Sequence, residues 1–166
     1  MNIQTSIVEK ALAHLHAGEL KQAERCLNHP AVQHHADALF LKGVVLMERN
    51  RPREAGSLFE QALEKQPDEP EYLAYLGLSR FRSGYNGLAL KTLSEARTLD
   101  ERHINSRLFL AQCLLMINLT EEALGLFNEV LALDHWHLPA RFGKIQALLR
   151  LGQLDLAARE LEETGP

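Results

Sequence analysis

The sequence predicts an all-α fold built from repeated helix pairs, and three observations support this. The 166 residues include 32 Leu and 19 Ala but only 5 each of Val, Ile and Thr, a balance that favours helices over strands. Similar residues recur every 34 positions along most of the chain, and a period of this length indicates a repeat architecture. The prolines fall between repeats or at a turn, so none interrupts a predicted helix.

Three kinds of position define the repeat. A small residue lies on the first helix at Gly43, Gly77 and Ala111. The turn after that helix holds Gly18, Asn50, Gly84, Asn118 and Gly152, and a residue that can adopt a positive φ is expected to end a helix there. The second helix carries Ala23, Ala55, Ala89, Ala123 and Ala157, each followed four residues later by Leu or Phe. Small residues at these positions allow two helices to approach closely.

The repeats follow one another over a single predicted domain, residues 1–166. The first copy, about 4–35, is irregular, because its markers precede those of the second by 32 residues instead of 34. The next three copies span about 36–69, 70–103 and 104–137, and the fifth, 138–166, is truncated. In the second copy, Leu39 and Leu46 before the turn and Phe59 and Leu63 after it have helical spacing. Pro52 can open the second helix at its first position.

These residues resemble the tetratricopeptide repeat, whose pattern places L-G on the first helix and A-x3-F on the second. Leu76-Gly77 and Ala55 with Phe59 reproduce those pairs. The resemblance implies a right-handed α-solenoid of about five antiparallel helix pairs, in which the first helices line a concave groove. At the family's Trp position this chain has Leu39, Leu73, Arg107 and Arg141, so we expect a less apolar seam toward the end of the chain.

The resemblance also places a peptide-binding groove. The residues at its groove positions are Phe40, Leu41, Val44, Met47, Tyr75, Leu78, Phe81, Leu108, Phe109, Gln112, Phe142 and Gln146. This surface is apolar and aromatic, which suits an apolar peptide or an amphipathic helix of a partner protein. Alternatively, some of these side chains, Phe40 and Phe81 first, pack between adjacent helices. A clamp for a terminal carboxylate is not expected, because its positions hold Val8, Leu12, Leu41, Glu71 and Tyr75.

Composition and motifs exclude several other classes. A net charge of −4 argues against a nucleic-acid partner, and no apolar run approaches the roughly 20 residues that cross a bilayer. The start of the chain has no secretory pattern, so we expect a cytoplasmic protein. We expect no cofactor, metal ion or catalytic residue, with Cys26 and Cys113 as buried free thiols. Loop histidines, including His135 and His137, are interpreted as solvated, and Trp136 as filling a gap between repeats.

The C-terminal end has more than one interpretation. Leu154, Leu156 and Leu161 on the last helix lack a full partner. A frayed end, self-association, or removal from a longer chain would each explain this, although Glu160, Glu162 and Glu163 could supply a polar outer face.

The predicted function is a non-enzymatic scaffold, as an adaptor or chaperone that holds an apolar segment of a partner. In size and groove character the chain is similar to the cytoplasmic chaperones of type III secretion translocators. Two alternatives stay open: the N-terminal repeat module of a larger bacterial enzyme, of glycosyltransferase or sulfotransferase type, and a structural homo-oligomer formed through the C-terminal end or the groove.

Overall fold

The computed structural model describes residues 2–164, which form ten α-helices and one short 3₁₀ helix, with no β-strand in that range. In chain order these are α1 (Ile3–His16), α2 (Leu20–Leu27), the 3₁₀ helix η1 (Pro30–Val32), α3 (Ala36–Glu48), α4 (Pro52–Lys65), α5 (Pro70–Arg82), α6 (Asn86–Leu99), α7 (Ile104–Met116), α8 (Thr120–Leu133), α9 (Leu138–Arg150) and α10 (Leu154–Thr164). The predicted all-α class is confirmed.

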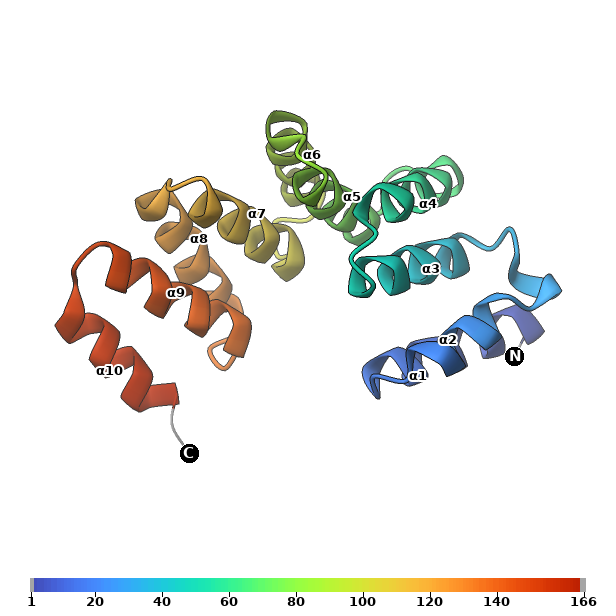
Figure 1. The fold of residues 1–166 in the computed structure, drawn as a ribbon, viewed down its shortest axis with the longest axis horizontal. Coiled ribbons are helices and arrows are strands. Elements are labelled where there is room, and N and C mark those ends of the chain that lie inside the picture. The colour runs from blue at the N-terminus through green and yellow to red at the C-terminus, as the bar shows by residue number, and fades with distance from the viewer. Residues whose placement is uncertain (1, 165–166) are drawn as a thin grey trace.

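The helices form consecutive pairs arranged along an arch (Figure 1). The main associations join the two helices of a pair, or helices of neighbouring pairs. Figure 1 shows α1–α2 and α9–α10 at opposite ends of the arch, with α4 and α6 on its outer side relative to α3 and α5. The predicted solenoid of helix pairs is therefore confirmed, and its inner side is formed mainly by first helices.

Each first helix ends two residues before the Gly or Asn that the repeat pattern marks. Asn50 and Asn118 adopt φ of 57° and 66°, and the three glycines at this position have φ between 72° and 91°. Left-handed backbone of this kind stops a helix and lets the chain reverse into the second helix. Asparagine tolerates the left-handed region better than most residues, which explains why it alternates here with glycine.

Replacing Gly84 by valine is expected to lower the free energy of unfolding by at least about 1–2 kcal/mol. No heavy atom lies within 4 Å of a Cβ built there, so the cost arises from the φ of +91° alone. Gly87→Ala in α6 is the matched control, because that position is equally open but lacks a positive φ. Urea denaturation measures both variants, and an equal loss in the two would contradict this explanation.

The small residues on the first helices mark close contacts with the second helices. A Cβ at Gly43 would lie 2.4 Å from Cε1 of Phe59, and one at Gly77 would lie 2.6 Å from Cγ of Leu93. Such distances are far below van der Waals contact, so a larger residue would push the pair apart. Ala89 is fully buried in the same interface, and its carbonyl oxygen lies 3.3 Å from the Cβ position of Gly77.

The first repeat is irregular, as predicted. Its second helix, α2, has eight residues, whereas α4 has 14, and η1 makes the connection to α3. Buried Ala11, Leu27, Val32 and Val45 belong to a separate core cluster beneath this repeat. Phe40 packs against that cluster and against the two clusters that follow, so it joins the first repeat to the rest of the solenoid.

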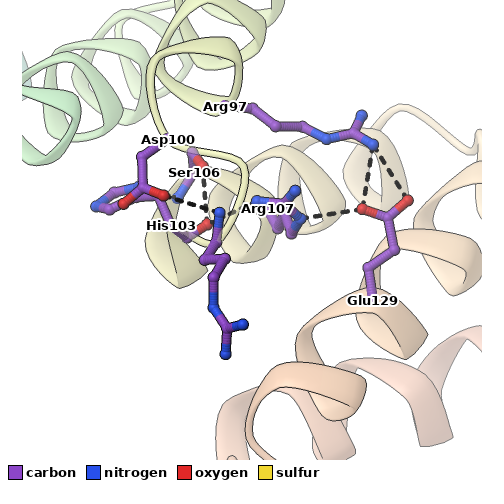
Figure 2. A network of polar contacts seen from close by, with 7 residues as sticks. Arg97, Asp100, His103, Ser106, Arg107 and Glu129 are labelled. Carbon is purple, nitrogen blue, oxygen red and sulfur yellow. Dashed lines mark hydrogen bonds and ion pairs between the residues drawn. The ribbon is translucent and has the colours of Figure 1, made fainter.

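The expected polar seam is present in the fourth repeat. Figure 2 shows Arg97 from α6 and Arg107 from α7 converging on Glu129 of α8. Arg97 Nη2 and Arg107 Nε each lie 3.1 Å from Glu129 Oε2. Arg107 is buried and also donates from Nη1 to the carbonyl oxygen of His103, so its charge is well partnered.

The fifth repeat has a more deeply buried version of this seam. Arg141 is 1% exposed, and its Nη1 lies 3.0 Å from Glu160 Oε1. Lys144 Nζ lies 2.6 Å from the other oxygen of the same carboxylate. The prediction that Glu160 belongs to a polar outer face is therefore wrong, because the positive charges of α9 draw it into the interface, whereas Glu162 and Glu163 are exposed.

The interpretation of Trp136 as a gap filler is also wrong. Its side chain is 69% exposed, with its ring beside His135 and 5.2 Å from the guanidinium carbon of Arg141. This arrangement is a cation–π contact over a surface loop.

The last helix leaves Leu154, Leu156 and Leu161 exposed, as the sequence predicts. The predicted end of the fifth repeat, Gly165-Pro166, lies outside the described residues. None of the helices in residues 2–164 is long and apolar enough to cross a membrane.

Candidate functional site

The predicted groove residues all lie on the first helices of the second to fifth repeats, α3, α5, α7 and α9. They differ in how much of each side chain is accessible to a partner. The buried members are Leu41, Met47, Leu78, Leu108 and Phe109. The half-buried members are Phe40, Val44, Tyr75, Phe81 and Gln112, and the exposed members are Phe142 and Gln146. The accessible part of the predicted surface therefore rests on a buried apolar layer from the same helices.

An aromatic ladder runs across the middle of this surface. Tyr75 packs edge-to-face on Phe40 at 5.2 Å between ring centroids, and on Phe109 at 5.0 Å. The three rings come from α3, α5 and α7, so they connect three successive repeats. Phe59 of α4 supports the ladder from below, 5.6 Å from Phe40 and 5.8 Å from Tyr75. Edge-to-face pairs of this kind hold the rings in defined positions.

One hollow, which we name the N-terminal hollow, lies on the first-repeat side of the ladder. It has a volume of about 420 Å³ and is lined by Leu12, Leu15, His16, Gly18, Leu20, Phe40, Leu41, Val44, Glu48, Glu71, Tyr75 and Asn105. Burial raises the pKa of Tyr75 to about 12, with a further contribution from the charges of Glu71 and Glu48 that Arg82 opposes. The hollow thus combines aromatic and aliphatic walls with two carboxylates.

Glu71 is held in place by two side chains at the start of α7. His103 Nδ1 accepts the backbone N–H of Ser106, so the other ring nitrogen, Nε2, donates to Glu71 Oε2 at 2.6 Å. Asn105 Nδ2 donates to Glu71 Oε1 at 2.7 Å. Sequence reasoning missed this contact, although Glu71 and Asn105 are 34 residues apart and therefore occupy equivalent positions on adjacent helices.

A second hollow adjoins the first, toward the start of the first helices. Its volume is about 490 Å³, and its lining consists of Thr5, Val8, Glu9, Leu12, His35, Asp37, Phe40, Leu41, Glu69, Glu71 and Tyr72. Tyr72 donates its hydroxyl to Asp37, and burial together with this carboxylate raises the pKa of the tyrosine. Carboxylates therefore continue along this part of the groove.

A third hollow, which we name the C-terminal hollow, lies beyond the ladder. Its volume is about 480 Å³, and it is lined by Leu78, Phe81, Arg82, Gln112, Cys113, Leu115, Met116, Phe127, Pro139, Phe142, Gly143, Gln146 and Arg150. Met116 is 70% exposed and Phe142 is 54% exposed, so large apolar groups here face solvent. The described part of the groove therefore brings the predicted residues together in two main places, on either side of Tyr75 and Phe109.

The repeat pattern and this geometry agree with sequence comparisons. The family model described as "Anaphase-promoting complex, cyclosome, subunit 3" matches residues 48–130, and a model described as "Tetratricopeptide repeat" matches residues 8–70. The chain belongs to the tetratricopeptide repeat family. No match is found among curated protein sequences.

Solved structures of tetratricopeptide repeat proteins share the fold. A thermophilic tetratricopeptide repeat protein from Thermus thermophilus, TTC0263, has a TM-score of 0.85 at 15% identity, covering 97% of this chain and 89% of its own. PilF of Pseudomonas aeruginosa has a TM-score of 0.80 at 19% identity, covering 98% and 77% respectively. A crystal structure of MamA has a TM-score of 0.70 at 15% identity, covering 99% and 93%. At these identities the likeness concerns the fold alone.

The groove of this tetratricopeptide repeat protein differs from a carboxylate clamp. Val8, Leu12, Leu41 and Glu71, which stand at the clamp positions, line one hollow together with Glu9, Asp37 and Glu69. Neither Lys nor Arg is among the residues that line it. A terminal carboxylate placed there would meet like charge, which raises the free energy of binding.

Both cysteines are free thiols, and three of the histidines cap helices. Cys113 is buried under the C-terminal hollow, and burial raises the pKa of its thiol to about 12. Cys26 is free as well but only partly buried, which corrects the prediction for that residue. Among residues 2–164, no group of three His, Cys, Asp or Glu side chains is arranged to hold a metal ion. His29, His103 and His137 instead cap helices, each accepting a backbone N–H at Nδ1.

Proposed function

We propose that the chain is a non-enzymatic adaptor or chaperone that holds an apolar segment of a partner protein in its concave groove. The observation that carries the proposal is the pair of solvent-exposed apolar side chains over the C-terminal hollow, Met116 and Phe142. Exposing large apolar groups next to one another is unfavourable in water, so a surface of this kind is typical of an interaction site.

The dimensions of the groove support the same proposal. The two main hollows, of about 420 and 480 Å³, are in the size range of sites that accept several side chains. They are lined mainly by first helices and lie on opposite sides of one aromatic ladder. A segment that laid apolar side chains into both hollows would cover the ladder between them, as amphipathic helices do in hydrophobic grooves.

Replacing Phe142 and Met116 together by glutamate is expected to abolish capture of the partner from a native extract. Both side chains are exposed, so the fold is expected to survive, and circular dichroism checks this. Leu88→Glu is the matched control, because Leu88 is an exposed apolar residue of α6, on the outer side of the arch. Mass spectrometry of the bound proteins identifies any partner kept by wild type and control but lost from the groove variant. A partner retained equally by all three proteins would place binding outside the groove.

A further inference from the structure

The last residues of the five first helices form a row along one edge of the groove. α1, α3, α5, α7 and α9 end at His16, Glu48, Arg82, Met116 and Arg150. Apart from the irregular first step, these residues are 34 positions apart, so they occupy one equivalent position in successive repeats. The charged side chains of this row are acidic in the second repeat, at Glu48, and basic in the third and fifth, at Arg82 and Arg150.

The acidic part of the row belongs to the N-terminal hollow. Glu48 lines it, as does Glu71, which stands near the start of α5 at the opposite edge. The adjoining hollow adds three carboxylates, those of Glu9, Asp37 and Glu69. Neither Lys nor Arg appears in the lining of either hollow. This half of the groove therefore has an excess of carboxylates next to the rings of Phe40 and Tyr75.

The basic part of the row belongs to the C-terminal hollow. Arg82 and Arg150 line it, and its lining contains neither Asp nor Glu. Arg150 donates to the carbonyl oxygen of Leu115, which leaves its charge without a carboxylate partner in residues 2–164. Arg82 and Glu48 likewise take part in no ion pair within the described chain. The two halves of one apolar groove thus present opposite charges that a bound molecule can neutralise.

We propose that the groove selects an amphipathic helix of a partner protein that carries a basic residue at one end and an acidic residue at the other. The basic end lies in the N-terminal hollow at Glu48, next to the ring of Tyr75. Glu71 lines the same hollow, and its carboxylate already accepts hydrogen bonds from His103 and Asn105. The acidic end lies at Arg150 of α9, and Arg82 of α5 lies between the two ends. This inference rests on the proposed function, and it adds the chemistry and the orientation of the partner.

The spacing between the first helices sets the length of such a bound helix. Neighbouring packed helices lie about 8–10 Å apart, so the three steps from α3 to α9 span roughly 24–30 Å. At about 1.5 Å per residue this corresponds to roughly 16–20 residues. Complementary charge at both ends favours one orientation and penalises the reversed one, because reversal brings like charges together at each end.

The test uses a fluorescein-labelled peptide of about 18 residues with leucine and phenylalanine at helical spacing, lysines at one end and glutamates at the other. A second peptide has glutamine at every charged position. In fluorescence anisotropy the charged peptide is expected to bind at least about fivefold more tightly than the neutral one, and the difference is expected to shrink at high salt.

Charge reversal in the protein assigns each end. Glu48→Lys is expected to weaken binding of the charged peptide about fivefold. Replacing only the lysines at one end of that peptide by glutamates is expected to restore the affinity. Arg150→Glu is expected to be rescued only by changing the glutamates at the other end of the peptide to lysines. Glu64→Lys in α4 and Arg159→Glu in α10 are the matched controls, because both residues are exposed on second helices, and neither is expected to change binding.

The outcomes separate this inference from the function on which it rests. If both peptides bind with equal affinity and Phe142→Glu abolishes binding, the groove is a binding site but its charges do not select the partner. If binding to a charge-reversed protein is restored by changing the opposite end of the peptide from the one expected, the assigned orientation of the bound helix is wrong. If neither peptide binds, or binding survives Phe142→Glu, the occupant is not an amphipathic helix in this groove. A homodimer that dissociates on Phe142→Glu would assign the groove to a second copy of the chain.

Discussion

Replacing Phe127 by alanine is expected to lower the free energy of unfolding by about 3–5 kcal/mol, the usual range for a buried phenylalanine. The side chain is fully buried on α8, and a Cβ at Gly143 of α9 would lie only 2.3 Å from its ring. Truncation would leave a cavity between the fourth and fifth repeats, and glycine offers no side chain to fill it. Urea denaturation followed by circular dichroism measures the loss.

Two further substitutions decide whether burial is the cause. Phe142→Ala removes the same atoms from an exposed side chain of α9 and is expected to cost well under about 1 kcal/mol. Phe59→Ala is expected to cost about as much as Phe127→Ala, since Phe59 is also fully buried and its ring fills the space above Gly43. Similar losses for Phe127 and Phe142 would show that α9 does not pack as described.

The repeat frame was predictable because each of its residues has a local mechanical role. Spacing alone places Asn50 and Gly84 in turns, and both adopt the positive φ that such a turn requires. The same spacing places Gly43 and Gly77 at close helix contacts, and neither position has room for a Cβ. These local requirements do not depend on the side chains elsewhere in the repeat. The 34-residue period was therefore enough to predict how the helices pair.

The division of groove residues between core and surface was not predictable. Phe109 and Phe142 both occupy groove positions, yet Phe109 is buried and Phe142 is half exposed. The two residues are 33 positions apart, so they stand at neighbouring and not equivalent positions of the repeat, and Tyr75 of α5 packs edge-to-face on Phe109. Such a contact depends on the size of the side chain one repeat away, which a position-by-position assignment does not consider.

Hydrogen bonds and ion pairs between neighbouring helices were not predicted, for a related reason. The sequence predicts solvated loop histidines, but His103 caps α7 and donates to Glu71 of α5. Glu160 has the sequence context of a polar outer face, yet it lies against Arg141. Aligning the repeats with one another, instead of interpreting each helix alone, places Glu71 beside Asn105 and Glu48 beside Arg82. The same alignment gives the row of residues at the ends of the first helices.

Replacing Glu160 by leucine is expected to destabilise the docking of α10 by about 3–5 kcal/mol, because the buried charge of Arg141 would lose its closest carboxylate. Glu163 lies 3.6 Å from the same guanidinium but is exposed, so it compensates only in part. Since α10 contacts mainly α9, we expect local rather than global opening. Hydrogen exchange measures this as lost amide protection over α10 with α3–α7 unchanged. Glu162→Leu, at an exposed position on the same helix, is the control and is expected to leave protection intact.

The double variant Arg141→Met/Glu160→Leu is expected to regain most of that protection, to within about 1 kcal/mol of wild type or better. Removing both charges leaves no buried ion to neutralise, and the equivalent positions of earlier repeats, Leu39 and Leu73, show that this site accepts an apolar side chain. Lys144 keeps access to solvent, so losing its carboxylate partner costs little. A double variant as poorly protected as Glu160→Leu alone would mean that the ion pair positions α10 in a way that apolar packing cannot replace.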